Sequence, residues 1–368
     1  MTRQGRVVPA AVPLLLLCLI LTALPVHGEE IVREFTFESS ALHLSHMIGE
    51  VTVRQGATDA FRVQVTVRGG DAAPGLIEFI TDDDDGKGLV IGFPIDDHTR
   101  YVYPELGRGS KTTITFQGQE SHEGSWLKRV FAGMSGKKIT VTGDGRGLEL
   151  WADVVVEVPR GGDLEVKLGV GEITAADLAA DLNLDTNSGA IYVERLTGDL
   201  LADTGSGRVA VAGIDGEVNI DTGSGSVSVS DCRGDEIKVD TGSGGVDAAK
   251  ISCENFDVDT GSGSVEAIGI ATDKARIDTG SGSVTLQLDR MGTGRFVIDT
   301  GSGSIDLMLP ANASARIEAD TGSGSVKSRI DGAEIHRKSR DELEMTVGGG
   351  EARVTLDAGS GSITIGME

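Results

Sequence analysis

The sequence is dominated by one repeated string of five residues. Asp-Thr-Gly-Ser-Gly occurs seven times, beginning at Asp203, Asp221, Asp240, Asp259, Asp278, Asp299 and Asp320. Variants of the string begin at Asp185 and Asp357, and a weaker relative begins at Lys167. Successive copies are 18 to 21 residues apart, except for one final step of 37 residues. Self-similarity at such a period is typical of a chain that stacks one structural unit many times.

Alternating apolar residues lie on both sides of each string. Val218 and Ile220 precede the string at Asp221, and two further valines follow it. A period of two places these side chains on one face of a strand. The Thr-Gly-Ser-Gly part is expected to turn because its glycines tolerate positive φ. Each period therefore predicts strand, turn, strand, turn, with the Asp pointing outward.

One such unit cannot bury its apolar face alone, but units stacked in register about 4.8 Å apart share a continuous core. Helical alternatives fail because glycine recurs inside every window and no period near 3.6 residues is present. The sequence therefore predicts an all-β fold, a parallel β-solenoid with two strands per rung of 18–21 residues.

The repeat divides the chain into regions. Residues 161–330 are expected to form the solenoid, and residues 331–368 a C-terminal capping turn, because a charged stretch interrupts the period there. Residues 29–160 predict a less regular N-terminal β region with an aromatic-rich insertion at residues 94–136. The aromatic side chains either close the end of the solenoid as a lid or form a partner contact. They include Tyr101, Tyr103, Phe116, Trp126 and Phe131.

Residues 1–28 have the features of a Sec-type signal peptide. Two arginines precede an apolar run at residues 10–24, and cleavage is expected near Gly28. The run is shorter than the roughly 20 residues that a membrane-spanning helix needs. A retained membrane anchor and a lipid attached to Cys18 are the alternatives. The prediction is an extracytoplasmic protein, whether periplasmic, secreted or on the cell surface, with no integral membrane span in the mature chain.

The charge balance limits the partners. The formal net charge is −24, and phosphate binding needs clustered Lys and Arg. Nucleic acid and anionic membrane are therefore not expected as partners. The expected partner is an unidentified ligand of the cell surface or envelope.

The repeated aspartates are candidates for an ion site. Carboxylates stacked about 4.8 Å apart repel each other, which raises pKa values or attracts cations. Hydrogen bonding of each Asp within its own turn is the alternative. No other cofactor is indicated, and the calcium candidates are Asp203, Asp221, Asp240, Asp259, Asp278, Asp299 and Asp320.

Catalysis is not indicated by any spacing. Apolar-Asp-Thr-Gly-Ser, as at residues 297–302, is also the signature of aspartic proteases. Those enzymes need two carboxylates that face each other and share a proton, whereas a regular step stacks these in a line. The six histidines are scattered, and their spacing indicates no Ser-His-Asp or Cys-His grouping. We therefore expect no enzyme and no catalytic residues.

Two cysteines, Cys232 and Cys253, follow the predicted leader. They fall in equivalent turns of adjacent rungs, although their offsets differ by two residues. In an oxidising compartment this predicts a disulfide between them.

The arrangement resembles a bacterial family of adhesin-like proteins with β-strand repeats, which is a domain of unknown function. The likeness is carried by residues 156–164, by the Asp-Thr-Gly-Ser-Gly-Ser-Val turns and by residues 309–315. It covers roughly residues 29–368, and the aromatic insertion departs from it. The resemblance implies a repeat architecture and transfers no catalytic residue.

These observations favour an exported, non-catalytic binding, adhesin-like or structural module of the cell surface or envelope. The first alternative is a structural rod stabilised by calcium on the Asp row. The second is an enzyme whose site lies on the insertion at residues 94–136.

Overall fold

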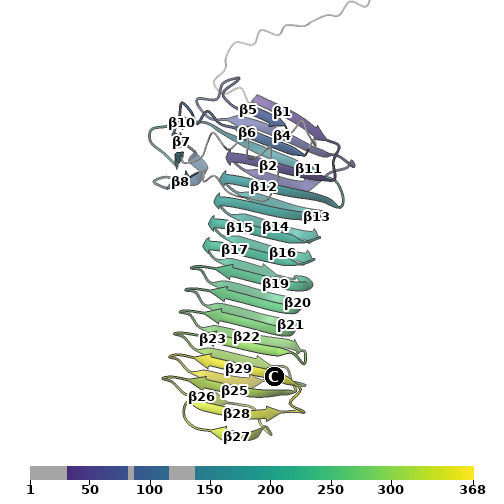
Figure 1. Cartoon of the computed structure of the whole chain (residues 1–368), viewed down its shortest axis with the longest axis vertical. Coiled ribbons are helices and arrows are strands. Elements are labelled where there is room, and N and C mark those ends of the chain that lie inside the picture. The colour runs from purple at the N-terminus through teal and green to yellow at the C-terminus, as the bar shows by residue number, and fades with distance from the viewer. Residues whose placement is uncertain (1–30, 82–86, 116–136) are drawn as a thin grey trace, which may run out of the picture.

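The computed structural model describes residues 31–81, 87–115 and 137–368. The chain is an elongated stack of strands, with β1 near one end and β27 at the other (Figure 1). In these ranges the only helix is the short 3-10 helix η1 (Pro104–Leu106), and no helix is long and apolar enough to cross a membrane. The predicted signal peptide at residues 1–28 lies outside the described residues.

Most strands belong to two faces that run along the stack. The aspartate face, which carries the motif aspartates, contains β12 (Gly162–Val170), the end of β13 (Ile173–Ser188), β15 (Leu200–Ser206), β17 (Val218–Ser224), β19 (Arg233–Thr241), the ends of β20 (Val246–Thr260) and β21 (Val265–Thr279), and β23 (Arg295–Thr300). The second face contains the beginnings of β13, β20 and β21 together with β14 (Ile191–Thr197), β16 (Val209–Asp215), β18 (Val227–Ser230), β22 (Val284–Met291) and β24 (Ile305–Leu309).

Neighbouring rungs pair in parallel and in phase with the repeat. Asp203 lies opposite Asp221, and Val218 lies opposite Ile237 in the next rung. The inward side chains are buried, as for Ile220 at 0% exposure, and each buried Val or Ile stabilises the fold by about 1.5–3 kcal/mol. The predicted parallel β-solenoid with two strands per rung is confirmed.

The motif turn is explained by close stacking. In Thr260 the side chain points inward and its hydroxyl donates to the carbonyl of Gly244 in the previous rung at 3.0 Å. A Cβ added to Gly225 would lie 1.8 Å from the carbonyl oxygen of Gly207. Most motif glycines, Gly225 among them, have no positive φ. The expectation that positive φ requires them is therefore wrong, because it is the backbone of the neighbouring rung that leaves no room for a side chain.

A second backbone feature repeats at the corner of each rung that lies opposite the motif turn. One residue per rung has a left-handed backbone there, and this corner column repeats every 18 or 19 residues. Each member precedes an inward-pointing apolar residue, such as Leu196 after Arg195. Four of the six are not glycine, and the members are Asp177, Arg195, Gly213, Asp231, Lys250 and Gly269.

The parallel stack begins earlier than the predicted boundary at residue 161. β2 (Ala41–Ile48) pairs in parallel with β12, and β3 (Val51–Gln55) pairs in parallel with β13. Residues 41–55 are thus a rung of the solenoid. Antiparallel strands then close the end, namely β1 (Ile31–Phe37), β4 (Phe61–Arg68) and β11 (Trp151–Val158), with the hairpin of β5 (Glu78–Thr81) and β6 (Gly88–Gly92) beside β2.

The insertion and residues 138–149 together form a second, small sheet. Its strands follow the order β10 (Leu148–Glu149), β7 (Arg100–Val102), β9 (Lys138–Thr142) and β8 (Lys111–Thr115). Tyr101 and Tyr103 are 0% and 2% exposed, and the ring of Tyr101 meets Phe93 edge-on at 5.9 Å. These two tyrosines are buried core residues, so neither presents its side chain to a partner. Phe116, Trp126 and Phe131 lie outside the described residues.

At the far end the chain doubles back into the stack. β29 (Ala352–Ala358) pairs in parallel with both β23 and β25 (Ala315–Thr321). On the second face β30 (Ile363–Met367) likewise pairs with β24 and β26 (Val326–Ser328). Figure 1 accordingly shows the C-terminus within the stack, above the tip.

The cap is therefore smaller than residues 331–368. It consists of β28 (Glu342–Val347), antiparallel to β25, and the exposed β27 (Glu334–Lys338). The expectation that the final strand pair closes the end is wrong, because an in-phase rung pairs equally well on both of its sides.

Candidate functional site

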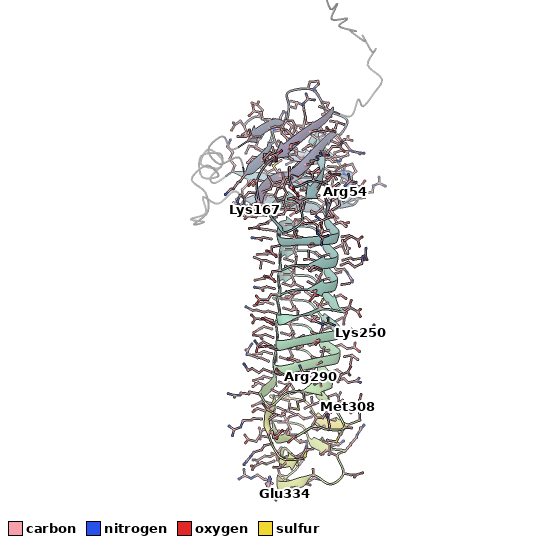
Figure 2. The ribbon with its side chains drawn as sticks, turned by 90° about the vertical axis from the view of Figure 1, so that its right-hand side faces the viewer. Arg54, Lys167, Lys250, Arg290, Met308 and Glu334 are labelled. Carbon is pink, nitrogen blue, oxygen red and sulfur yellow. The ribbon has the colours of Figure 1, made fainter. Side chains whose placement is uncertain are left out.

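The outer surface of the aspartate face is the candidate site, because identical side chains recur there rung after rung. Figure 2 shows side chains projecting from the stack along its whole length, with Lys167 near one end and Glu334 at the opposite tip. The aspartate ladder is the column of motif aspartates, and all of them point outward. Their spatial order is Asp185, Asp203, Asp221, Asp240, Asp259, Asp278, Asp299, Asp357 and Asp320.

Burial, and after it repulsion between neighbouring carboxylates, raises the pKa of several ladder aspartates. Burial, and next the charge of Asp203, raise the pKa of Asp185 to about 6. Burial followed by the charge of Asp221 also raises the pKa of Asp203. The same two causes raise the pKa of further members, namely Asp240, Asp299 and Asp320. Ionising the ladder therefore opposes folding.

A cluster of charged side chains around the buried Glu165 stands at the head of the ladder. Lys167 occupies the ladder position of its rung, opposite Asp185. Its Nζ lies 2.6 Å from Glu165 Oε1, and His43 Nδ1 lies 2.6 Å from Glu165 Oε2. These contacts, with the His43 hydrogen bond the largest, lower the pKa of Glu165 to about 2. The cluster joins β2 to β12 and so fixes the first two rungs together.

A cation also bridges the ladder at mid-length. Arg276 donates to Asp278 at 2.8 Å and to Asp259 at 3.4 Å, and it lies 3.6 Å from Asp257. One guanidinium therefore offsets the repulsion of two successive ladder aspartates.

The ladder geometry does not gather metal ligands. In the described ranges no three His, Cys, Asp or Glu side chains form a group that could hold a metal ion. A column with one carboxylate per rung offers a cation the oxygens of neighbouring rungs only, whereas Ca²⁺ takes six to eight oxygen ligands. Calcium on the seven motif aspartates remains a prediction, and it has a direct test (Discussion).

The predicted disulfide is not present. Cys232 and Cys253 are both free and buried. Strand register places Cys253 opposite Gly234, so the cysteines are one rung and two residues apart. This offset separates their Cα atoms by about 8 Å, beyond the roughly 7 Å limit for a disulfide. The thiol of Cys232 instead donates to the carbonyl of Ser230 at 3.2 Å.

Sequence reasoning missed a shallow groove beside the ladder. It has a volume of about 320 Å³ and is lined by the first outward residues of five strands together with Leu201, Asn219 and Lys238. Leu201 is 40% exposed at its rim. The sequence contains a pattern that could have predicted this groove, because an acidic residue stands directly before the first apolar residue of each of these strands.

Fold and surface together define the class, a parallel β-solenoid closed at both ends by antiparallel strands and carrying a ladder of aspartates. Residues 198–366 match the model of the Toastrack family, DUF4097, which is a domain of unknown function. The resemblance to adhesin-like β-strand repeat proteins is thereby confirmed. No curated protein matches the chain.

Several solved structures are similar over most of their length. A protein described as a putative adhesin from Bacteroides fragilis is 13% identical, with 92% of this chain and 97% of that chain covered and a TM-score of 0.30. One so described from Parabacteroides distasonis is 11% identical, with coverages of 91% and 97% and a TM-score of 0.32. A protein from the same species described as a putative lipid binding protein is 14% identical, with coverages of 92% and 96% and a TM-score of 0.31.

Proposed function

We propose that this protein is an exported, non-catalytic binding module of the cell surface or envelope, which holds an extended ligand against its aspartate face. The observation that carries the proposal is the ladder of nine in-phase aspartates. It repeats one anionic group at a constant step of about 4.8 Å. A repetitive surface of this kind fits a repetitive ligand, such as an envelope polymer.

The descriptions of similar proteins agree with a role in binding. The matched family, Toastrack, is a domain of unknown function, while similar solved structures are described as putative adhesins or as a putative lipid binding protein. The outward columns also supply many weak, equivalent contacts, which is the arrangement that multivalent binding uses.

The test uses the in-phase repeat to change the length of the face without changing its chemistry. Deleting residues 203–220 removes one complete period and leaves the strand register intact. Binding is measured to immobilised peptidoglycan, to a panel of immobilised envelope polysaccharides and to phospholipid vesicles. We expect affinity for one of these to fall with each period deleted and to rise when the period is duplicated.

A matched control separates face length from stability. The variant with residues 203–220 duplicated has one additional rung, and circular dichroism reports whether each variant keeps its β content. If no probe binds, or if deletion and duplication leave the affinity unchanged, the proposal is overturned. Release of soluble fragments from any probe, detected by chromatography, would show catalysis and overturn it as well.

Export has a separate test. Residues 1–28 are fused to a β-lactamase without its own leader and expressed in a Gram-negative host. Growth on ampicillin, with an N-terminus at Glu29 in the recovered enzyme, is expected for a cleaved signal peptide. Sensitive cells would contradict export, and resistant cells with an uncleaved fusion would indicate the retained anchor.

A further inference from the structure

The first outward position of the aspartate face forms a column whose charge changes sign along the solenoid. We call it the graded column. Strand register and the bonds between adjacent rungs place its members in one line. In spatial order they are Asp163, Asp181, Asp199, Glu217, Glu236, Asn255, Lys274, Arg295, Arg353 and Arg316.

The graded column is exposed, and much of its charge has no counterion among the residues that the structure describes. All of its charged members are exposed. In the described part of the chain no ion pair involves Lys274, Arg295 or Arg353, whereas Arg316 contacts Glu318 and Glu344. The polarity depends on the fold, because Arg353 enters the basic half only through insertion of the C-terminal rung.

A column with this order of charges is electrostatically complementary to the same column running in the opposite direction. An anionic polymer would match the basic half and be repelled by the acidic half. A cationic polymer would match the acidic half and be repelled by the basic half. A second copy that runs antiparallel matches both halves at once. Such a contact is isologous, so a single twofold axis relates the two copies and closes the assembly as a dimer.

We propose that two copies of this chain pair antiparallel along their graded columns, about a twofold axis that passes between Glu236 and Asn255. The axis falls at the centre of the ten positions, so each acid meets a base of the partner copy. The opposed pairs are Asp163 with Arg316, Asp181 with Arg353, Asp199 with Arg295, and Glu217 with Lys274.

The central part of the adjacent outward column is complementary about the same axis, whereas its outermost pair sets Glu165 opposite Glu318. Leu201, which is 40% exposed, lies opposite Val297 of the second copy in this arrangement. Lys238 likewise lies opposite Asp257. These residues occupy equivalent positions on successive rungs, so the groove beside the acidic half receives an apolar side chain at Leu201.

The two aspartate faces meet at an angle. The graded columns are in contact, and the two faces diverge from this line of contact. This keeps the aspartate ladders apart, because ladder aspartates that faced each other would repel. Ten positions give a contact about 45 Å long. Its total area is roughly 1,000 Å², the size of weak and transient complexes, so the dimer has a micromolar Kd that rises with salt.

Sedimentation velocity over a dilution series tests the proposal. At 50 mM NaCl we expect a dimer that dissociates at 500 mM NaCl. Arg295→Asp or Asp199→Arg alone is expected to raise the dimer Kd at least about tenfold, because each places like charges opposite each other. The double variant Asp199→Arg/Arg295→Asp restores the pairing and is expected to return the Kd to within about threefold of the starting value.

Controls address charge and register. Lys327→Asp makes the same charge change as Arg295→Asp on an exposed residue of the second face and should leave the Kd unchanged. Mixing a Glu236→Cys chain with an Asn255→Cys chain should give a disulfide-linked dimer, whereas mixing Glu236→Cys with Arg316→Cys should not. A monomer at about 100 µM and 50 mM NaCl, or a Kd indifferent to Arg295→Asp, would overturn the proposal.

Discussion

Arg195 holds Asp177 through a two-point ion pair, and both residues have left-handed backbones. Nε lies 2.6 Å from Oδ1 and Nη2 lies 3.0 Å from Oδ2, while φ is 55° at Arg195 and 58° at Asp177. A charged pair recurs in the corner column three rungs later, where Lys250 Nζ lies 3.3 Å from Asp231 Oδ1. The six members of the corner column thus follow the order acid, base, glycine, and this order occurs twice. In each case an ion pair between adjacent rungs joins the acid and the base, both of which have left-handed backbones.

Replacing Lys250 with glycine should stabilise the protein. Its φ of 55° costs a residue with a Cβ about 1 kcal/mol, whereas glycine adopts it freely. The exposed ion pair with Asp231 is worth less than this. We expect Lys250→Gly to raise the free energy of unfolding by about 0.5–1 kcal/mol in urea titrations. Lys238→Gly, in an extended strand, should lower it, and a loss of stability in both variants would refute the assignment of strain.

Alanine at Gly225 should be severely destabilising. The added Cβ would lie 1.8 Å from the carbonyl oxygen of Gly207, and the two rungs would have to separate. We expect a loss of about 3 kcal/mol or more in the free energy of unfolding. Ser224→Ala in the same turn, where the side chain is exposed, is the control and should change stability by less than about 0.5 kcal/mol. Equal effects in the two variants would argue against close stacking as the reason for the motif glycine.

The ladder should make stability rise as the pH falls below neutrality. Asp185 has a pKa of about 6 in the folded chain against an ordinary value of 3.8. The folded state therefore binds the proton more tightly, and ionisation of Asp185 destabilises it at pH 7. The penalty declines as the pH falls below about 6 and is gone only below the ordinary pKa of 3.8.

Asp185→Asn isolates this effect. We expect the variant to be more stable than the parent by about 1–2 kcal/mol at pH 7, allowing for solvent screening, and equally stable near about pH 3. The comparison matters because burial lowers the pKa of His46 to about 4, so the whole protein loses stability from this histidine over the same range. His46 is unchanged in the variant, and its contribution cancels. A gain that is the same at both pH values would contradict the ladder explanation.

Calcium should act on the ladder as a screening ion. Because the carboxylates form a line with one group per rung, we expect CaCl₂ and MgCl₂ at equal ionic strength to raise Tm by the same small amount. Differential scanning calorimetry in each salt, and then with EDTA, makes the comparison. A rise of many degrees for calcium alone, reversed by EDTA, would mean that the motif aspartates bind the ion specifically.

The C-terminal rung should be among the best protected parts of the chain. The amide of Arg353 donates to the carbonyl of Gly294, and that of Ala352 to Ser314, so β29 is bonded on both sides. β27 is exposed throughout. Hydrogen exchange followed by mass spectrometry should show β29 exchanging on the order of a hundredfold more slowly than β27. Equal rates would mean that the C-terminal strand does not lie inside the stack.

Much of the architecture was predictable from the sequence. The period fixes two strands per rung, the outward Asp and the parallel stacking, because identical units placed in phase bring like residues together at every level. The aspartate ladder from Asp185 onward follows directly from this. The groove beside the acidic half was also within reach, since its acids recur at one position of the repeat.

The tertiary structure decided which rungs are neighbours. Any two in-phase rungs can pair, so the period alone cannot place Asp357 between Asp299 and Asp320, nor residues 41–55 at the head of the stack. Burial of Tyr101 and the two-residue offset of the cysteines likewise depend on packing and register. The charge order of the graded column combines both sources, because the sequence supplies the acids and bases and the stacking order sets their alignment.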